Sequence, residues 1–186
     1  MSQWKEQVRQ AAEEMTQLPQ ITPGEIPDIE LYMDQLLTYL DRRLGFFGQG
    51  EEGSFVTKAM INNYSKAKLL PPARSKRYGK DHVMALTLIG QLKRVLPVQE
   101  MDKILGQAPQ QMEGLYELFL KAQRQAFFQA PQLAQELLEE AADQEEWGSA
   151  AVVIQLAAEA QMRLLLAQRL LDGSPRPAAE KSEKKK

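Results

Sequence analysis

The chain has 186 residues, of which 44% are hydrophobic and 26% charged, a composition typical of a soluble globular protein. It contains no cysteine, which excludes a disulfide framework and thiolate-bound zinc. Residues 1–15 are too polar for a secretion signal, and Glu159 and Arg163 interrupt the most apolar stretch. We therefore expect a cytoplasmic protein with no membrane span.

The positive charges are concentrated in one part of the chain. Residues 54–99 contain nine basic residues and a single acidic one, a balance of +8, whereas the whole chain carries −2 and the remainder therefore −10. A basic segment inside an acidic chain indicates a site for a polyanion, because net charge bears on binding partners and not on fold. The alternative is a solvated surface on which lysines occur by chance.

Apolar spacing predicts helices from the N-terminus onward. Residues 2–17 form one amphipathic pattern, and residues 18–27 contain three prolines and a glycine, which predicts a connector. Asp28 can cap a second helix, which we expect to run to Leu44. Its apolar positions follow the spacing of three and four that buries one face: Ile29, Tyr32, Met33, Leu36, Leu37, Leu40 and Leu44. Residues 45–53, with four glycines, predict a loop.

The basic segment itself predicts a helix, a turn and two further helices. Thr57 can cap a helix over residues 57–67 with Met60, Ile61 and Tyr64 inward, and the Leu-Leu-Pro-Pro sequence at 69–72 should end it. Residues 73–78 form a short, strongly basic turn. Residues 80–96 are apolar on nearly all sides, which is typical of a helix at the centre of a core, and residues 98–105 predict a short helix.

Beyond residue 108 the sequence becomes acidic and rich in Leu, Ala and Gln. We expect three helices there, at 109–129, 131–147 and 149–171, two of them with a proline in the first turn. The domains predicted are an N-terminal helix and connector (1–27), a domain around the basic segment that is the candidate for binding a polyanion (28–106), a C-terminal helical domain (107–172) and a disordered charged tail (173–186).

The order of residues in the basic segment carries a resemblance. The run 57–64, then 68–72 with Leu-Leu-Pro, then Arg77-Tyr78, resembles the DNA-binding domain of MerR-type transcription regulators over about 50 residues. The wider frame, with Ile26-Pro27-Asp28 and residues 31–34, also resembles a family of uncharacterised bacterial proteins with a MerR-like domain (domain-of-unknown-function family eighteen thirty-six). The resemblance implies an all-α fold in which a winged helix-turn-helix unit packs with a C-terminal helical layer.

The same resemblance implies which residues meet double-stranded DNA. The helix 57–67 would enter the major groove, where an asparagine can bond an adenine edge at two points, and lysines beside it would neutralise phosphates. The basic turn would act as the wing. The candidate DNA-binding residues are Lys58, Asn62, Asn63, Lys66, Arg74, Lys76 and Arg77. Tyr64 and Tyr78 could touch phosphate, but we interpret both as core residues.

Four aromatic residues and the single histidine are also candidate functional residues. Tyr116, Phe119, Phe127 and Trp147 could line a pocket for a small-molecule effector, as in the C-terminal regions of related regulators, or simply form a helical core. His82, the sole histidine, is interpreted as a polar residue of a first helical turn. No set of acid, base, nucleophile or metal ligands is assembled, so neither enzyme activity nor a cofactor is expected.

Two functions therefore remain open at the level of sequence. The first is a MerR-like transcriptional regulator that binds double-stranded DNA, is expected to be a homodimer, and does not bind membranes. The second is a helical protein–protein interaction module whose MerR-like unit no longer binds DNA. The position of the cations distinguishes them, since a DNA-binding unit should present them together on one exposed surface.

Overall fold

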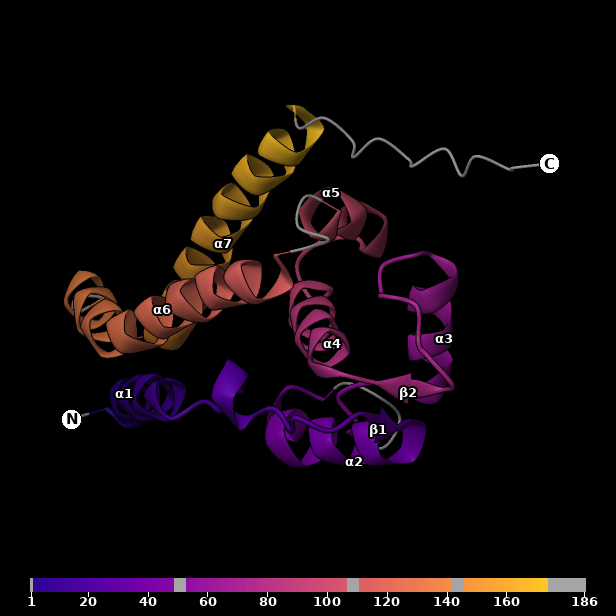
Figure 1. Ribbon diagram of the computed structural model, residues 1–186. Helices are drawn as coiled ribbons and strands as arrows, with labels where there is room; N and C mark the ends of the chain where they lie inside the picture. The colour runs from indigo at the N-terminus through magenta and orange to yellow at the C-terminus, as the bar shows by residue number, and fades with distance from the viewer. Residues whose placement is uncertain (1, 49–52, 107–110, 142–145, 174–186) are drawn as a thin grey trace.

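The computed structural model describes residues 2–48, 53–106, 111–141 and 146–173, and this part of the chain is mostly helical. Figure 1 shows two parts: α2 to α5 with a small sheet, and a layer of long helices beside them. The helices are α1 (Gln3–Thr16), α2 (Met33–Leu44), α3 (Lys58–Lys66), α4 (Lys80–Leu92), α5 (Met101–Leu105), α6 (Met112–Glu140) and α7 (Gly148–Gly173). The antiparallel strands β1 (Leu31–Tyr32) and β2 (Arg77–Tyr78) are two residues each.

The second helix begins later than the sequence indicates. Asp28 does not cap it: α2 starts at Met33, and the backbone N–H of Tyr32 donates to Gln35 Oε1 at 2.9 Å. The preceding residues are extended because Leu31 pairs with Tyr78 and Tyr32 with Arg77, a contact across 45 residues that helical periodicity cannot reveal. Ile29 and Tyr32, predicted to be buried, are consequently 70% and 53% exposed.

Helix α4 lies at the centre of the core, as its sequence predicts. Its residues from His82 to Gly90 are all buried, and the apolar faces of α2, α3 and α6 pack around it. Leu36, Leu40 and Leu44 of α2 and Ile61 of α3 are completely buried in this cluster. The predicted inward positions of Tyr64 and Tyr78 are also confirmed, at 5% and 8% exposure.

Proline does not divide the C-terminal helices as expected. Instead of ending one helix and starting another, Pro131 lies inside α6, which runs without a break over 29 residues. The missing N–H removes one backbone hydrogen bond, with a typical cost of about 3 kcal/mol in a helix interior. Ala130 and Ala134, on either side of the proline, are buried against Ala12 of α1. That packing holds the helix continuous where local preference would end it.

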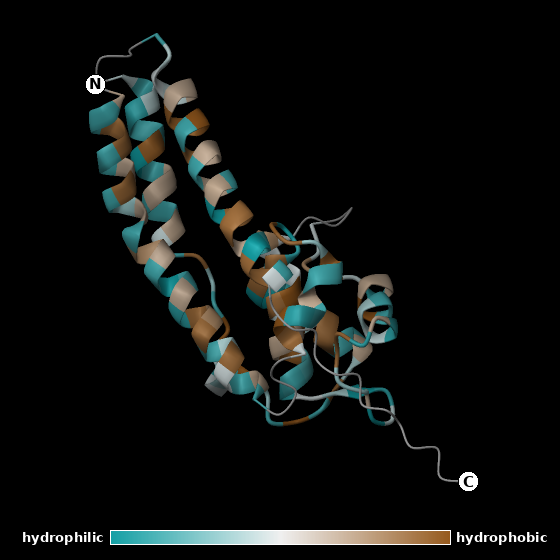
Figure 2. Ribbon diagram, turned by 90° about the horizontal axis from the view of Figure 1, so that it is seen from above, coloured by the Kyte–Doolittle hydropathy of each residue, from teal (hydrophilic) through white to brown (hydrophobic). Residues whose placement is uncertain are grey.

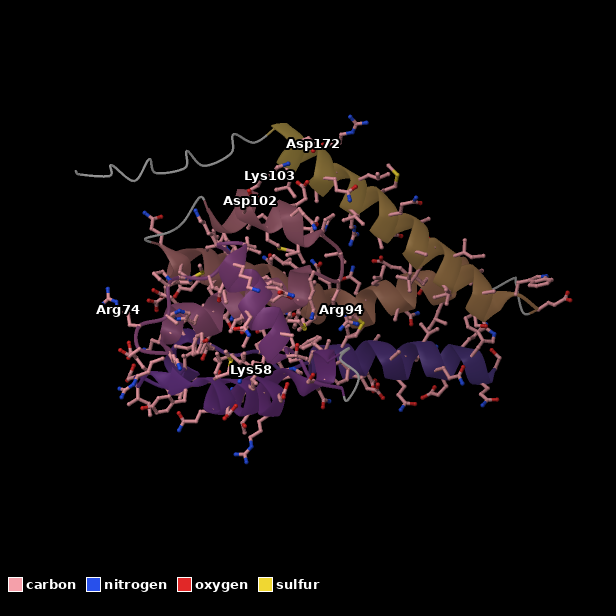
Figure 3. All side chains as sticks on the ribbon, turned by 90° about the vertical axis from the view of Figure 1, so that its right-hand side faces the viewer. Lys58, Arg74, Arg94, Asp102, Lys103 and Asp172 are labelled. Atoms are coloured by element: carbon pink, nitrogen blue, oxygen red, sulfur yellow. The ribbon has the colours of Figure 1, made fainter. Side chains whose placement is uncertain are left out.

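The remaining long helices form a layer of their own. α1, from the N-terminus, lies against α6 and α7, so three helices run side by side in Figure 2. The far end of α7 approaches α5, where Lys103 is 7% exposed and its Nζ lies 2.7 Å from Glu100 and 3.8 Å from Asp172 (Figure 3). The contact between Lys103 and Asp172 connects the helical layer to the last helix of the other part.

Helix α7 is unusually apolar for its exposure. It contains an 18-residue window with a mean hydropathy of 1.4, of which 6% is buried, and by length and composition alone this helix could cross a membrane. By this test of length and composition, the charged residues Glu159 and Arg163 do not exclude α7 as a membrane-spanning helix. The expectations of no membrane contact and of a cytoplasmic location stay predictions.

Candidate nucleic-acid interface

The position of α3 depends on an aromatic side chain just before it. The predicted loop between α2 and α3 is long, and residues 49–52 in it lie outside the described residues. Phe55 anchors its end: the side chain is 1% exposed, and its backbone N–H donates to Asp41 Oδ1 on α2 at 2.8 Å. The ring packs so closely on Gly90 of α4 that a Cβ there would lie 2.4 Å from Phe55 Cζ. α3 is therefore fixed to both α2 and α4 despite the long connection.

The N-terminal end of α3 has the cap that its sequence predicts, whereas its C-terminal end is closed by a motif that precedes the prolines and was not predicted. Thr57 is the N-cap, and its hydroxyl accepts from the Met60 N–H at 3.3 Å. At the C-terminal end the N–H of Leu69 donates to Tyr64 O at 3.0 Å and that of Lys68 to Ser65 O at 3.1 Å, the pattern of a Schellman motif. Lys68 occupies the left-handed position, with φ of 59°, where glycine is usual.

The outer face of α3 presents polar side chains to solvent. Lys58, Asn62, Asn63 and Lys66 are all exposed, while Ile61 and Tyr64 face the core. This division follows from the helical period, which places the two sets on opposite sides. Lys58 lies on the side of the molecule that is turned toward the viewer in Figure 3.

The basic turn next to α3 is a tight hairpin. Ser75 and Lys76 both have positive φ, 49° and 59°, and the N–H of Arg77 donates to Arg74 O at 2.9 Å. Two central residues with positive φ define a type I′ turn, which normally prefers Asn and Gly, so this turn carries backbone strain. Arg74, Lys76 and Arg77 are exposed, and in Figure 3 Arg74 projects outward from the edge of the molecule.

The base of this hairpin is fastened to β1 through Arg77 and Tyr32. Their backbones pair in the sheet, the guanidinium lies 5.2 Å from the centre of the Tyr32 ring, and Nη2 donates to the Tyr32 hydroxyl at 3.1 Å. Arg77 is thus a positioned cation, whereas no ion pair involves Lys58, Lys66, Arg74 or Lys76 within the described ranges. Tyr32 was predicted to be buried in the core. Its pairing with Arg77 in the sheet places it at the surface instead.

His82 holds the other side of the hairpin base. It is 8% exposed; its Nδ1 accepts from the Gly79 N–H at 3.1 Å and its Nε2 donates to Pro71 O at 3.0 Å. Burial lowers the pKa of His82, so the neutral ring is favoured. His82 is therefore buried and fully hydrogen-bonded, not simply a polar residue of a first turn. Its position three residues after the N-cap Gly79 is the one sequence signal for this role.

The four residues suggested for an effector pocket do not come together. Tyr116 is completely buried, its hydroxyl donates to Ile21 O at 2.7 Å, and its ring centre lies 6.3 Å from that of Phe119. Trp147 is 64% exposed, near the start of α7. None of these residues, nor Phe127, lines the large groove that the structure forms between α1, α6 and α7. Tyr116 and Phe119 belong to the core because α6 packs on α4.

Comparison with known proteins identifies one family. Residues 21–123, more than half of the chain, match the model described as Domain of unknown function (DUF1836). The match begins before β1 and ends within α6, and so contains the whole of the α2–α5 part. No curated protein and no solved structure matches the chain.

Proposed function

The chain belongs to the DUF1836 family, and we propose that it is a DNA-binding transcriptional regulator with a winged helix-turn-helix unit. In this proposal α2 and α3 are the helix pair, α3 enters the major groove, and the hairpin at 74–77 is the wing. The MerR-like character of the unit belongs to the same proposal. A dimer and a small-molecule effector are further expectations of the MerR resemblance.

The order and pairing of the elements support this interpretation. A strand precedes the helix pair, a hairpin follows α3, and β2 returns to pair with the first strand, so α3 and the hairpin lie at one edge of the molecule (Figure 1). The buried Phe55 holds α3 against α2 and α4, which leaves its outer face open. A helix of this kind can offer side chains to base edges while the adjoining turn contacts the backbone.

The chemistry of the exposed residues suits a duplex. Lysines and arginines on α3 and on the turn can neutralise phosphates, which supplies most of the affinity that does not depend on sequence. Asn62 and Asn63 are the exposed amides on α3, and an asparagine can bond adenine N6 and N7 together.

One observation carries the proposal. Lys58, Lys66, Arg74 and Lys76 are exposed, come from adjoining elements at one edge, and have no carboxylate partner within the described residues. A surface that docked an acidic protein could also be cationic, but the amides on the same helix face add the hydrogen bonding that base edges require.

The test is duplex binding measured by fluorescence anisotropy at several salt concentrations, with a duplex selected by this protein from a random-sequence library. We expect log K to fall with log[salt] at a slope of about −4 or steeper, since each neutralised phosphate contributes about −0.9. Lys66→Ala should weaken every duplex alike and reduce that slope by about 1. Asn62→Ala should instead reduce discrimination between the selected duplex and others, by about 1–3 kcal/mol.

The matched control is Lys121→Ala, because Lys121 is an exposed lysine on α6, away from the proposed surface. It should change neither the affinity nor the slope. A flat salt response, or an equal loss for Lys66→Ala and Lys121→Ala, would reject DNA as the partner and favour the protein–protein interaction module.

A further inference from the structure

The layer formed by α1, α6 and α7 contains an apolar groove that the proposed DNA-binding unit does not use. Its volume is about 800 Å³, and it is lined by residues of all three helices. Its floor contains alanines, among them Ala12, Ala130 and Ala134, which are too small to fill the space between the helices. Met15, Val153 and Leu156 line it and are 44%, 63% and 39% exposed. The groove is thus apolar surface that the described residues leave uncovered.

The lining residues define the length of the groove. Trp4 and Met15 lie on the same helix, eleven residues apart, which corresponds to about 16 Å along α1. Val152 packs with Leu137 near the Trp4 end, since these three belong to one cluster. Arg163 lies eleven residues further along α7 than Val152 and also lines the groove. The groove therefore runs along the helices, with Trp4 toward one end and Arg163 toward the other.

The dimensions of the groove suit a slender apolar chain. The groove has a volume of about 800 Å³ and follows about 16 Å of α1. An extended alkyl chain can lie along this axis, in contact with the apolar side chains and the alanines of the three helices.

The charged residues that line the groove indicate where the polar end of a bound ligand would lie. Among the described residues that line the groove, Arg163 and Glu136 are the charged ones, and Arg163 is the cation of the two. The Arg163 side chain is 79% exposed and lies 3.6 Å from Glu159, an exposed pair of the kind that contributes little. Its guanidinium can therefore turn to a carboxylate, with two parallel hydrogen bonds.

We propose that this groove binds a single-chain aliphatic carboxylate, with the alkyl chain along the three helices and the carboxylate at Arg163. Mostly apolar walls with a few polar groups, in a volume between 300 and 1,000 Å³, are general features of ligand sites, and this groove has them. The inference does not depend on DNA binding, so either proposal can fail without the other.

The test uses the full chain with Trp147→Phe, which leaves Trp4 as the only tryptophan and so as a fluorescent reporter inside the groove. The probe is sodium dodecanoate, titrated below its micelle concentration, with dodecyltrimethylammonium as the cation of equal chain length. We expect a saturable change in Trp4 fluorescence with dodecanoate and a clearly weaker one with the ammonium compound. This pair of ligands tests the charge preference without altering the groove.

Two pairs of variants locate the site. Arg163→Gln should weaken dodecanoate binding about tenfold, because the charge-assisted hydrogen bonds to the carboxylate are lost. Arg169→Gln, also exposed on α7 but outside the groove, should not. Ala11→Leu fills part of the lining and should abolish binding, whereas Gln10→Leu adds the same side chain to α1 outside it.

Several results would overturn the proposal. They are the absence of a saturable response, equal binding of the carboxylate and the ammonium compound, and equal effects of Arg163→Gln and Arg169→Gln. A fourth is a response seen only with phosphatidylcholine and phosphatidylglycerol vesicles, which would mean that the apolar surface of α7 meets a membrane.

Discussion

The two parts of this molecule differ in how fully side chains fill the space between their helices. In the part around α4, large side chains such as Phe55, Leu86 and Ile89 fill the interior and are at most 1% exposed. In the layer of α1, α6 and α7, buried contacts rest largely on alanines, while Ile154, Leu166 and other apolar residues of α7 remain exposed. A tightly filled core fixes the position of surface cations, whereas a loosely filled layer leaves room for a ligand.

This difference in packing predicts that, among single substitutions, one at Phe55 changes the free energy of unfolding the most. Phe55→Ala should lower the free energy of unfolding by about 3–5 kcal/mol, because it removes a buried ring and leaves a cavity beside Gly90. Urea denaturation would measure the loss. Phe46→Ala is the control: Phe46 lies in the same connection but is 69% exposed, and the change should be within about 0.5 kcal/mol. Similar losses would mean that Phe55 does not anchor α3.

A substitution in the other part should act in the opposite direction. Pro131→Ala restores a backbone N–H inside α6 and should raise the free energy of unfolding by about 1–3 kcal/mol. The same denaturation experiment measures it, with Gln132→Ala as an exposed neighbour that leaves the backbone bonding unchanged. A loss of stability would show that the geometry around Pro131 is needed for α6 to pack on α1.

The third prediction concerns pH and the hairpin base. The pKa of His82 is lowered in the folded state by burial, so the unfolded chain binds this proton more readily. The stability contributed by neutral His82 is therefore complete above the unfolded pKa of about 6.5 and is lost as the pH falls through the folded value. The acidic groups nearby, Asp81 and Glu30, act against this shift but do not reverse it.

Urea denaturation at pH 7.5 and at pH 5 would measure the effect, with His82→Gln as the comparison. The unaltered protein should lose more stability between the two pH values than the variant, which has no imidazole to protonate. An identical loss in both proteins would assign the acid sensitivity to other groups.

The smallest effect is expected at the end of α3. Lys68→Gly should raise the free energy of unfolding by up to about 1 kcal/mol, since glycine adopts the left-handed conformation without the strain of a side chain. Thermal denaturation would detect it as a higher Tm. Lys66→Gly, two residues earlier and inside the helix, should destabilise instead. A lower Tm for Lys68→Gly would mean that the lysine side chain itself stabilises this end.

Local signals allowed much of the α3 region to be predicted. The cap at Thr57, the inward positions of Ile61 and Tyr64 and the end of the helix before Leu69 all depend on residues within a few positions of one another. The helical period also places Lys58 and Asn62 on the outer, solvent-exposed face of α3. Arg77 is different, because its contact with Tyr32 depends on a strand 45 residues earlier.

The sequence by itself determined which segments are helical, which helix is central, and which side chains of α3 face solvent, because each of these follows from the spacing of residues along one element. The tertiary structure alone decided where α2 begins, that α6 continues through Pro131, and that α1 encloses a groove with α6 and α7. Those features depend on contacts between residues far apart in the chain, where packing outweighs the local preferences of a proline or a capping aspartate.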